Sequence, residues 1–300
     1  MRTPSANSQN ARLARSKAPR SPVHAFLLEP VVRAALLEDL SHGTDLTTDA
    51  IAGADQRATA HIVARSAGTI YGHGCARAAF TLLDSGSEYT AHVPDGGTAS
   101  GDQRVATISA RARAVLTAER TALNFLCRLS GIATATRALA DLVAEYPARV
   151  IDTRKTTPGL RALEKAAVLA GGGANHRFGL DDGVLIKDNH IAVAGSISAA
   201  VAAVRKHTGH MVKIEVEVDT LGQLREALEL NIDAVLLDNM PPEQLREAVQ
   251  LVAGRVVTEA SGGITPQRIA SVAATGVDLI SVGWITHSAP ALDLGLDITL

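Results

Sequence analysis

The chain has few cysteines and no long apolar run. Its two cysteines, Cys75 and Cys127, stand far apart and outside any Cys-x-x-Cys or metal-ligand spacing. This excludes a disulfide scaffold and a cysteine-based metal site, and it indicates reduced thiols in a cytoplasmic protein. No apolar stretch approaches the roughly 20 residues needed to span a bilayer, so we expect no membrane partner.

An excess of charge of one sign is also lacking, because the formal net charge is only -2. The whole molecule therefore has no strong attraction for nucleic acid or an anionic membrane, and any anion-binding site must be local. Hydrophobic residues make up 46% and charged residues 20%, as in folded globular proteins. A chain of 300 residues can form one large α/β barrel or two ordinary domains.

Acids are absent from the first 20 residues, which carry Arg2, Arg12, Arg15, Lys17 and Arg20. This composition cannot build a core, so we predict a disordered basic tail over 1–20. The alternative is an organellar transit peptide, because such peptides are rich in Arg and Ser and poor in acids. A clear amphipathic apolar face, which a transit peptide would have, is lacking.

Residues 21–131 have the pattern of a small α/β sandwich domain. Apolar spacing predicts two helices and three short strands here, over 29–40, 112–129, 58–64, 68–71 and 105–108. Turn-forming residues over 94–102 predict a loop.

Residues 132–287 are predicted to form a second domain, in which short apolar strands alternate with capped helices. The six expected strands are 149–153, 183–187, 212–218, 234–238, 255–259 and 278–282. Helix starts are indicated by Ser196 and Thr220 as N-caps, by Pro242, and by Thr265 before Pro266. Alternation of this kind implies parallel pairing, and six strands indicate an incomplete, open β/α barrel. For the last segment, 288–300, packing back on the first domain is one alternative.

In β/α barrels the active site lies at the C-terminal ends of the strands. Five cations fall around the first two predicted strands: Arg154, Lys155, His176, Arg177 and Lys187. Arg binds carboxylate through two parallel N–H bonds and Lys adds a point charge, so this grouping predicts a polyanionic ligand. The alternative is a solvated basic face with surface ion pairs.

Acids also mark the predicted strand ends. Glu217 and Asp238 end neighbouring strands, where two carboxylates can hold Mg²⁺, often through its waters, beside a phosphate-bearing substrate. Glu259 ends a further strand. Lys213 and Glu215 share the face of Glu217 by the two-residue period, and we interpret those two as a buried structural ion pair.

Glycines follow the late strands. Ser261, Gly262 and Gly263 come between a strand and a helix, and Gly283 follows the last strand. Barrels often bind phosphate at these loops through backbone N–H groups and a helix N-terminus. Glycine lets the backbone approach the oxygens closely, so a phosphate site is predicted here, with a simple turn as the alternative.

Long motifs occur in a fixed order along the chain. They are ERTALNFL (119–126), DTRKTTPGLR (152–161), GGANHR (172–177), LIKDNH (185–190), LDNM (237–240) and EASGGI (259–264). Through them, from about Glu38 to the C-terminus, the sequence resembles the quinolinate phosphoribosyltransferases, also called carboxylating nicotinate-nucleotide pyrophosphorylases. It departs from that pattern in an altered turn over 41–48, in Cys127 where a polar residue is common, and in the extra basic tail.

The resemblance implies a pentosyltransferase reaction of NAD biosynthesis. Quinolinate and phosphoribosyl pyrophosphate give nicotinate mononucleotide, pyrophosphate and CO₂. It also implies Mg²⁺ and a homodimer in which Arg120 is donated to the partner's active site. Without the resemblance, the alternative interpretation of Arg120 is an ordinary charged residue on a helix.

Carried over to this sequence, the resemblance implies a role for each matching residue. The residues implied for quinolinate binding are Arg120, Arg154, His176, Arg177 and Lys187. The catalytic residues implied at the sugar phosphate are Lys155, Lys187, Glu217 and Asp238, the last two beside Mg²⁺ and reaching it through water. The residues implied for phosphate binding are Ser261, Gly262, Gly263, Gly283 and His287.

Two other functional classes stay open at this point. A Schiff-base lyase would use Lys155 or Lys187 as its nucleophile. A non-catalytic relative, or a paralogue associated with molybdate-transport genes, should have lost a strand-end acid or the His176–Arg177 pair. Both features are intact here.

Overall fold

The computed structural model describes residues 23–41 and 43–299, so the predicted basic tail lies outside the described residues. The chain forms two compact units. We call residues 23–138, 155–173 and 283–299 the N-terminal unit, and residues 139–154 and 174–282 the C-terminal unit. This division differs from the predicted boundary between 131 and 132, because helix α5 (Ala112–Leu142) runs on through that point.

The N-terminal unit contains an antiparallel sheet in the order β12-β1-β5-β3. Its strands are β1 (Arg57–Ala64), β3 (Glu88–Ala91), β5 (Arg104–Arg111) and β12 (Leu294–Thr299). Burial alternates along β1, so one face of the sheet packs into the core. Strand β12 pairs along β1, from Ala64 opposite Leu294 to Thr59 opposite Thr299, and so brings the C-terminal segment into this sheet. The short strands β2 (Gly68–Thr69) and β4 (Thr98–Ala99) pair separately.

The helices of this unit differ in part from the predicted ones. They are α2 (Ala25–Asp39), α3 (Leu46–Ile51), α4 (His73–Leu83), α5, α6 (Arg161–Ala170) and α12 (Trp284–His287). Helix α2 begins at Ala25, before the predicted start at Glu29. Pro30, a residue type that favours the first turn of a helix, therefore lies inside it. Helix α5 continues past its predicted end at Leu129. The altered turn leads into α3, where Asp45 accepts the Thr48 N–H at 3.0 Å as an N-cap.

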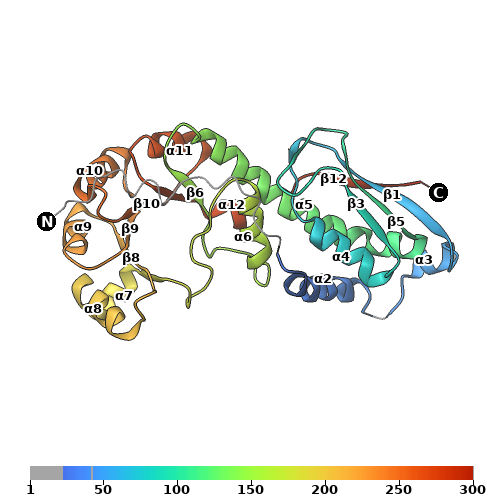
Figure 1. Cartoon of the computed structure of the whole chain (residues 1–300), viewed down its shortest axis with the longest axis horizontal. Coiled ribbons are helices and arrows are strands. Elements are labelled where there is room, and N and C mark those ends of the chain that lie inside the picture. The colour runs from blue at the N-terminus through green and yellow to red at the C-terminus, as the bar shows by residue number, and fades with distance from the viewer. Residues whose placement is uncertain (1–22, 42, 300) are drawn as a thin grey trace. The chain divides into compact units, whose positions relative to one another are not determined.

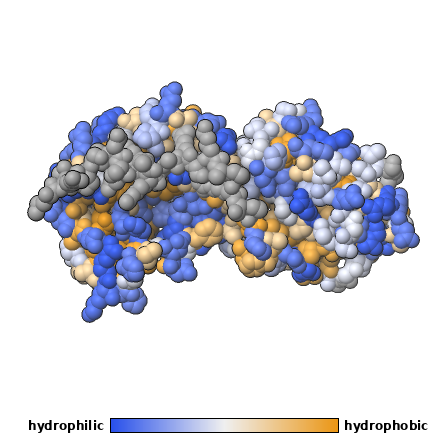
Figure 2. All heavy atoms as spheres, in the orientation of Figure 1, coloured by the Kyte–Doolittle hydropathy of each residue, from blue (hydrophilic) through white to orange (hydrophobic). Residues whose placement is uncertain are grey.

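Helix α2 also carries apolar side chains at the surface. Phe26, Leu27 and Leu37 are 66%, 49% and 60% exposed, and Figure 2 shows apolar atoms at the surface along this helix. Leu46 and Ile51 of α3 are likewise exposed. These apolar side chains of α2 and α3 therefore lie outside the core of the N-terminal unit.

The C-terminal unit is built on a six-stranded parallel sheet in the order β6-β11-β10-β9-β8-β7 (Figure 1). Its strands are β6 (Arg149–Ile151), β7 (Val184–Ile186), β8 (Ile214–Val218), β9 (Ala234–Asp238), β10 (Val257–Ser261) and β11 (Leu279–Ser281). Each overlaps one predicted strand. The sheet ends at β6 and β7 and is not closed, which confirms the predicted open β/α barrel.

Helices connect these strands as the capping residues indicated. They are α7 (Asp188–Ala194), α8 (Ile197–His207), α9 (Leu221–Leu228), α10 (Pro242–Val252) and α11 (Pro266–Ala273). Ser196 accepts the Ala199 N–H at 3.1 Å, and Thr220 accepts the Gln223 N–H at 3.2 Å. Pro242 and Pro266 stand in their first turns. No helix in the described ranges is long and apolar enough to cross a bilayer.

The strand register decides which side chains share a face of this sheet. Glu217 and Glu259 both pair with Leu236, and Ser261 pairs with Asp238. Lys187 follows β7 two residues after Leu185, which pairs with Glu215. Because alternate residues point to one side, the charged residues lie on one face and the apolar residues between them lie on the other, towards the helices. The residues on the polar face are Lys187, Glu215, Glu217, Asp238, Glu259 and Ser261.

Candidate active site

Lys187 and Glu217 meet on the polar face of the C-terminal sheet. Lys187 is the N-cap of α7, directly after β7, and its ammonium contacts Glu217 Oε2. The Lys187 side chain is half-exposed, whereas that of Glu217 is largely buried. The structure thus brings together two residues that were predicted from strand ends alone.

Asp238 is the last residue of the neighbouring strand β9 and is half-buried. Its Oδ2 accepts the Asn239 side-chain N–H at 2.5 Å, and the Asn239 backbone N–H donates to Ser261 at 2.9 Å. Glu217 and Asp238 therefore place two sets of carboxylate oxygens on one face of adjacent strands. Oxygen donors of this kind suit Mg²⁺, which usually keeps several of its waters. The donor chemistry of this pair fits the ion that the sequence predicted.

His176 lies against two buried glutamates of the same sheet. Its Nε2 is 3.0 Å from Glu215 Oε2 and 3.5 Å from Glu259 Oε2. Its Nδ1 accepts the Arg177 backbone N–H at 2.6 Å. With Nδ1 acting as an acceptor, the ring proton stands on Nε2 and is donated towards the glutamates.

These three residues also form a cluster of potential metal ligands, since their ligand atoms lie within 4.8 Å of one another. Because the Nε2 of His176 carries a proton, however, that nitrogen has no lone pair to offer an ion. The cluster is better described as an internal hydrogen-bonded group that orients His176 and, through its backbone contact, Arg177.

Glu259 lies deeper than the sequence predicted. Strand β10 runs on to Ser261, so Glu259 is inside the strand instead of at its end, and only 1% of it is exposed. Its Oε1 is buried with no hydrogen-bond partner in the described part of the chain. Burial first, and then the nearby Glu215 carboxylate, raise the pKa of Glu259 well above its usual range. The protonated form of Glu259 is therefore favoured.

Arg177 and Arg154 form a pair of cations close to each other. The Arg177 Nη1 donates to the Gly183 carbonyl at 2.9 Å, but its Nε is buried and has no partner among the described residues. Burial first, and then the charge of Arg154, lower the pKa of Arg177, while Glu215 and Asp182 oppose this shift. An anion at this point would accept the remaining N–H and offset the repulsion between the two guanidinium groups.

Sequence reasoning missed Asp152 and Glu215 as residues of this site. Asp152 is fully buried and accepts the His176 backbone N–H at 2.9 Å and the Asn175 side-chain N–H at 2.5 Å. It therefore positions the loop that carries His176 and Arg177. The signal available in the sequence was an acid directly before the Thr-Arg-Lys run.

The predicted ion pair between Lys213 and Glu215 is wrong. Lys213 lies ahead of β8, where it is exposed and pairs with Asp233 at 2.6 Å. Glu215 turns to His176 instead. The two-residue period placed Glu215 correctly on the face of Glu217, but it could not show which partner each residue takes.

The loop after β10 requires its glycines. Gly262 has a φ of +96° and Gly263 a φ of +58°, both in the left-handed region. A Cβ on Gly262 would overlap the side-chain oxygen of Asn239. Ser261 and these two glycines lead into the N-terminus of α11, the end of a helix that favours anions.

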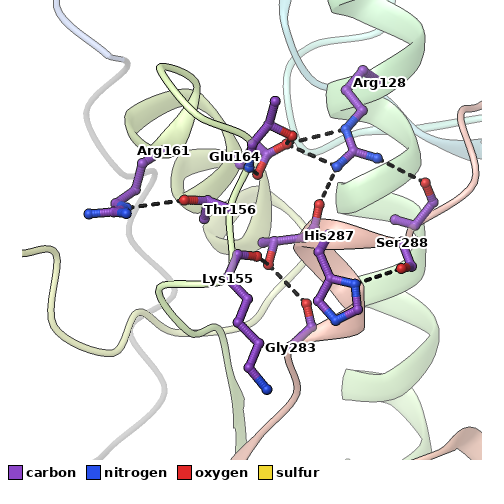
Figure 3. A network of polar contacts seen from close by, with 11 residues as sticks. Arg128, Lys155, Thr156, Arg161, Glu164, Gly283, His287 and Ser288 are labelled. Atoms are coloured by element: carbon purple, nitrogen blue, oxygen red, sulfur yellow. Dashed lines mark hydrogen bonds and ion pairs between the residues drawn. The ribbon is translucent and has the colours of Figure 1, made fainter.

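Three further predicted residues come together in the N-terminal unit (Figure 3). The Lys155 carbonyl accepts the Thr286 hydroxyl at 2.8 Å. A Cβ on Gly283 would lie 3.1 Å from the Lys155 side chain and 3.5 Å from the His287 ring. The His287 Nδ1 lies 2.6 Å from the Ser288 hydroxyl. The φ of Gly283 is -70°, which any residue can adopt, so glycine matters here through the close approach of the Lys155 side chain.

The predicted residues therefore form two groups, each within one unit. The residues in the C-terminal unit are Arg154, His176, Arg177, Lys187, Glu217, Asp238, Ser261, Gly262 and Gly263. Those in the N-terminal unit are Arg120, Lys155, Gly283 and His287. Arg120 lies exposed on α5.

Two family models match the chain. Residues 45–130 match the model of the quinolinate phosphoribosyl transferase N-terminal domain, and residues 132–297 match the model of its C-terminal domain. Together they extend over most of the described residues.

Similar proteins cover nearly the same length. A probable carboxylating nicotinate-nucleotide pyrophosphorylase of Bacillus subtilis is 45% identical over 91% of this chain and 94% of its own. A carboxylating nicotinate-nucleotide pyrophosphorylase of Mycobacterium leprae is 46% identical over 89% of this chain and 95% of its own. The solved structure of the nicotinate-nucleotide pyrophosphorylase from Francisella tularensis has a TM-score of 0.89 and 38% identity, covering 95% of this chain and 100% of that one.

Proposed function

Since the chain belongs to the quinolinate phosphoribosyltransferase family, we propose that it joins quinolinate to the ribosyl group of phosphoribosyl pyrophosphate. The products are nicotinate mononucleotide, pyrophosphate and CO₂, a step of NAD biosynthesis. One observation supports this most directly. Arg177 keeps a buried N–H without an acceptor in the described part of the chain, and it lies close to the like charge of Arg154.

Quinolinate binds at these two arginines. Its carboxylates accept the guanidinium N–H groups of Arg154 and Arg177, in the paired geometry that Arg offers to carboxylate. His176 fixes Arg177, because its Nδ1 accepts the Arg177 backbone N–H. Lys187 adds a further cation, and its contact with Glu217 holds its ammonium in place.

Glu217 and Asp238 would hold Mg²⁺ through its waters, and the bound ion would supply positive charge to neutralise the departing pyrophosphate. The two carboxylates lie on one face of neighbouring strands, as a shared hydrated ion requires. They also face the positive charge that develops on the ribose as its bond to pyrophosphate breaks.

Phosphate groups are bound by the two glycine-containing segments. Ser261, Gly262 and Gly263 offer backbone N–H groups before α11. The second segment provides the ammonium of Lys155 and the imidazole of His287. Gly283 lets the backbone come close to the bound group. Lys187 also acts on the sugar phosphate from its place at the end of β7.

The reaction needs no covalent bond to the protein. The pyridine nitrogen attacks the anomeric carbon while the carbon–oxygen bond to pyrophosphate breaks. The resulting pyridinium ring accepts the electron pair of the carbon–carboxylate bond as CO₂ leaves, and a proton from solvent then replaces the carboxylate. Alignment of two anionic substrates by fixed cations supplies much of the acceleration.

The functional protein is proposed to be a homodimer in the cytoplasm, with Arg120 completing the partner's site. The exposed apolar side chains of α2 and α3 support self-association, because isolated proteins rarely leave such surface uncovered. A partner arginine would add one more cation for the dicarboxylate.

The test is an assay of the purified chain with carboxyl-labelled quinolinate and phosphoribosyl pyrophosphate. We expect CO₂ and pyrophosphate in equal amounts, and loss of both when Mg²⁺ is replaced by a chelator. Release of pyrophosphate without CO₂ would contradict the proposed acceptor. A Schiff-base enzyme would act on an aldehyde or ketone, which quinolinate lacks, so release of CO₂ and pyrophosphate from quinolinate would argue against that class.

A further inference from the structure

We propose that Arg128 and Glu164 are positioning residues that hold the Lys155 loop and the Gly283–His287 turn together for phosphate binding. This inference rests on the proposed function, since it takes Lys155 and His287 as phosphate-binding groups. Neither Arg128 nor Glu164 belongs to the motifs from which the site was predicted.

Glu164 is a fully buried carboxylate in the first turn of α6. Its Oε1 accepts the Arg128 Nε at 3.2 Å and the Arg128 Nη2 at 3.0 Å. Thr157 donates its backbone N–H to Oε2 at 3.0 Å and its hydroxyl to Oε1 at 2.7 Å. Both oxygens are thus used, and one of the partners is the loop that continues from Lys155.

Arg128 reaches from α5 to the other segment (Figure 3). Its Nη1 donates to the Ala289 carbonyl at 3.1 Å, and its Nη2 also donates to the Thr286 carbonyl. These carbonyls lie at and after the end of α12, where a helix leaves its last acceptors without partners of its own. The planar fork of Arg128 therefore ties this turn to Glu164 and, through Glu164, to Thr157.

A direct bond completes the connection. The Thr286 hydroxyl donates to the Lys155 carbonyl at 2.8 Å and lies 3.0 Å from the Gly283 carbonyl. The Lys155 side chain lies so close to Gly283 that a Cβ there would be 3.1 Å away. The place of the Lys155 ammonium relative to His287 thus depends on contacts that Arg128 and Glu164 maintain.

Glu164 cannot itself meet a substrate, because its side chain is fully buried. The Arg128 side chain is 26% exposed, and its N–H groups donate to Glu164 and to the two carbonyls. Removing the cation beside a buried carboxylate is strongly destabilising. Lysine would keep the positive charge, but it lacks the planar arrangement of N–H donors that arginine has. Arg128→Lys is therefore the informative change: it keeps a positive charge near Glu164 but cannot hold both carbonyls.

The experiment compares the full-length wild type with Arg128→Lys and with the control Arg113→Lys. Arg113 lies on the same helix and also donates to a carboxylate and to carbonyls, those of Asp49 and Ala52, but in another part of the unit. Calorimetry gives the Kd for phosphoribosyl pyrophosphate and for quinolinate, and steady-state kinetics give the two KM values.

For Arg128→Lys we expect phosphoribosyl pyrophosphate to bind on the order of tenfold more weakly, with quinolinate changed by less than about threefold. Arg113→Lys should change neither by more than about twofold. Equal weakening of both substrates by Arg128→Lys, or a lower Tm with unchanged Kd values, would overturn the proposal, because a purely structural pair has no reason to favour one substrate.

A second variant keeps the test decisive if Arg128→Lys does not fold. Thr286→Val removes the hydroxyl bond to Lys155 at nearly constant volume, and it should weaken phosphoribosyl pyrophosphate selectively. Unchanged binding in a folded Thr286→Val protein would contradict the proposal. Because these Kd values need no turnover, a wild type that binds phosphoribosyl pyrophosphate but releases no CO₂ would refute the proposed reaction and leave this inference standing.

Discussion

Replacing Glu259 with Gln should stabilise the protein at alkaline pH and change its stability little at acidic pH. Glu259 is buried on β10, with one oxygen lacking a partner among the described residues and the other facing His176. Burial, followed by the Glu215 carboxylate, raises the pKa of Glu259 well above its ordinary value. Gln has nearly the same volume and keeps an N–H where the protonated acid has its O–H, so it imitates the protonated form.

The sign follows from proton linkage. An unfolded Glu loses its proton above a pKa of about 4.3, whereas the folded protein keeps the Glu259 proton to higher pH. The stability contributed by this proton is fully present below the unfolded pKa, and it is lost as pH rises through the folded pKa. A buried group left without its hydrogen bond costs about 1–3 kcal/mol, which we take as the alkaline advantage of the Gln variant.

The assay is thermal unfolding of both proteins at steps from about pH 5 to about pH 9. Each kcal/mol should appear as roughly 2–4 °C in Tm for a chain of this size. Glu247→Gln is the control, because Glu247 is half-exposed and pairs with Arg225 at 3.6 Å. Parallel pH curves for the wild type and Glu259→Gln would refute the assignment of a buried, protonated Glu259.

Three other outcomes are expected. Arg154→Ala should raise the KM for quinolinate about tenfold or more, since a charge-assisted pair is lost, and an unchanged KM would refute its role. Arg120→Ala subunits mixed with Arg154→Ala subunits should regain part of the activity, and no recovery in verified hybrid dimers would argue against a shared site. Gly262→Ala should lower stability by about 1–3 kcal/mol, because its φ is +96° and a Cβ would overlap Asn239. Gly209→Ala, with open space around its Cβ position, serves as the comparison by Tm.

Much of the C-terminal fold could be predicted because its signals are local. Ser196 and Thr220 precede helices as N-caps, and both make the expected bonds to backbone N–H groups. Short apolar strands between such helices leave parallel pairing as the simple solution. The same logic placed Lys187 beside Glu217, because residues at the ends of adjacent parallel strands meet at one edge.

Glu259 shows where local signals stop. The prediction ended its strand at Glu259, and a shift of the strand end to Ser261 changes that residue from a strand-end acid to a buried acid within the strand. Pattern alone locates strand ends poorly, since the backbone pairing with the next strand decides how far a strand runs. Helix α2 also begins before its predicted start, with Pro30 inside it and α4 packed against it, and such packing between elements is not contained in the local pattern.

By itself, the sequence determined the alternation of strands and helices, the capped helix starts, and the residue types that gather at the strand ends. Only the tertiary structure decided the partners: Glu215 with His176, Lys213 with Asp233, and Arg128 with Glu164. Periodicity and capping depend on neighbours within a few residues, so they can be deduced from the chain alone. The choice of a partner depends on which side chains packing brings within hydrogen-bond distance, and no short-range pattern specifies that.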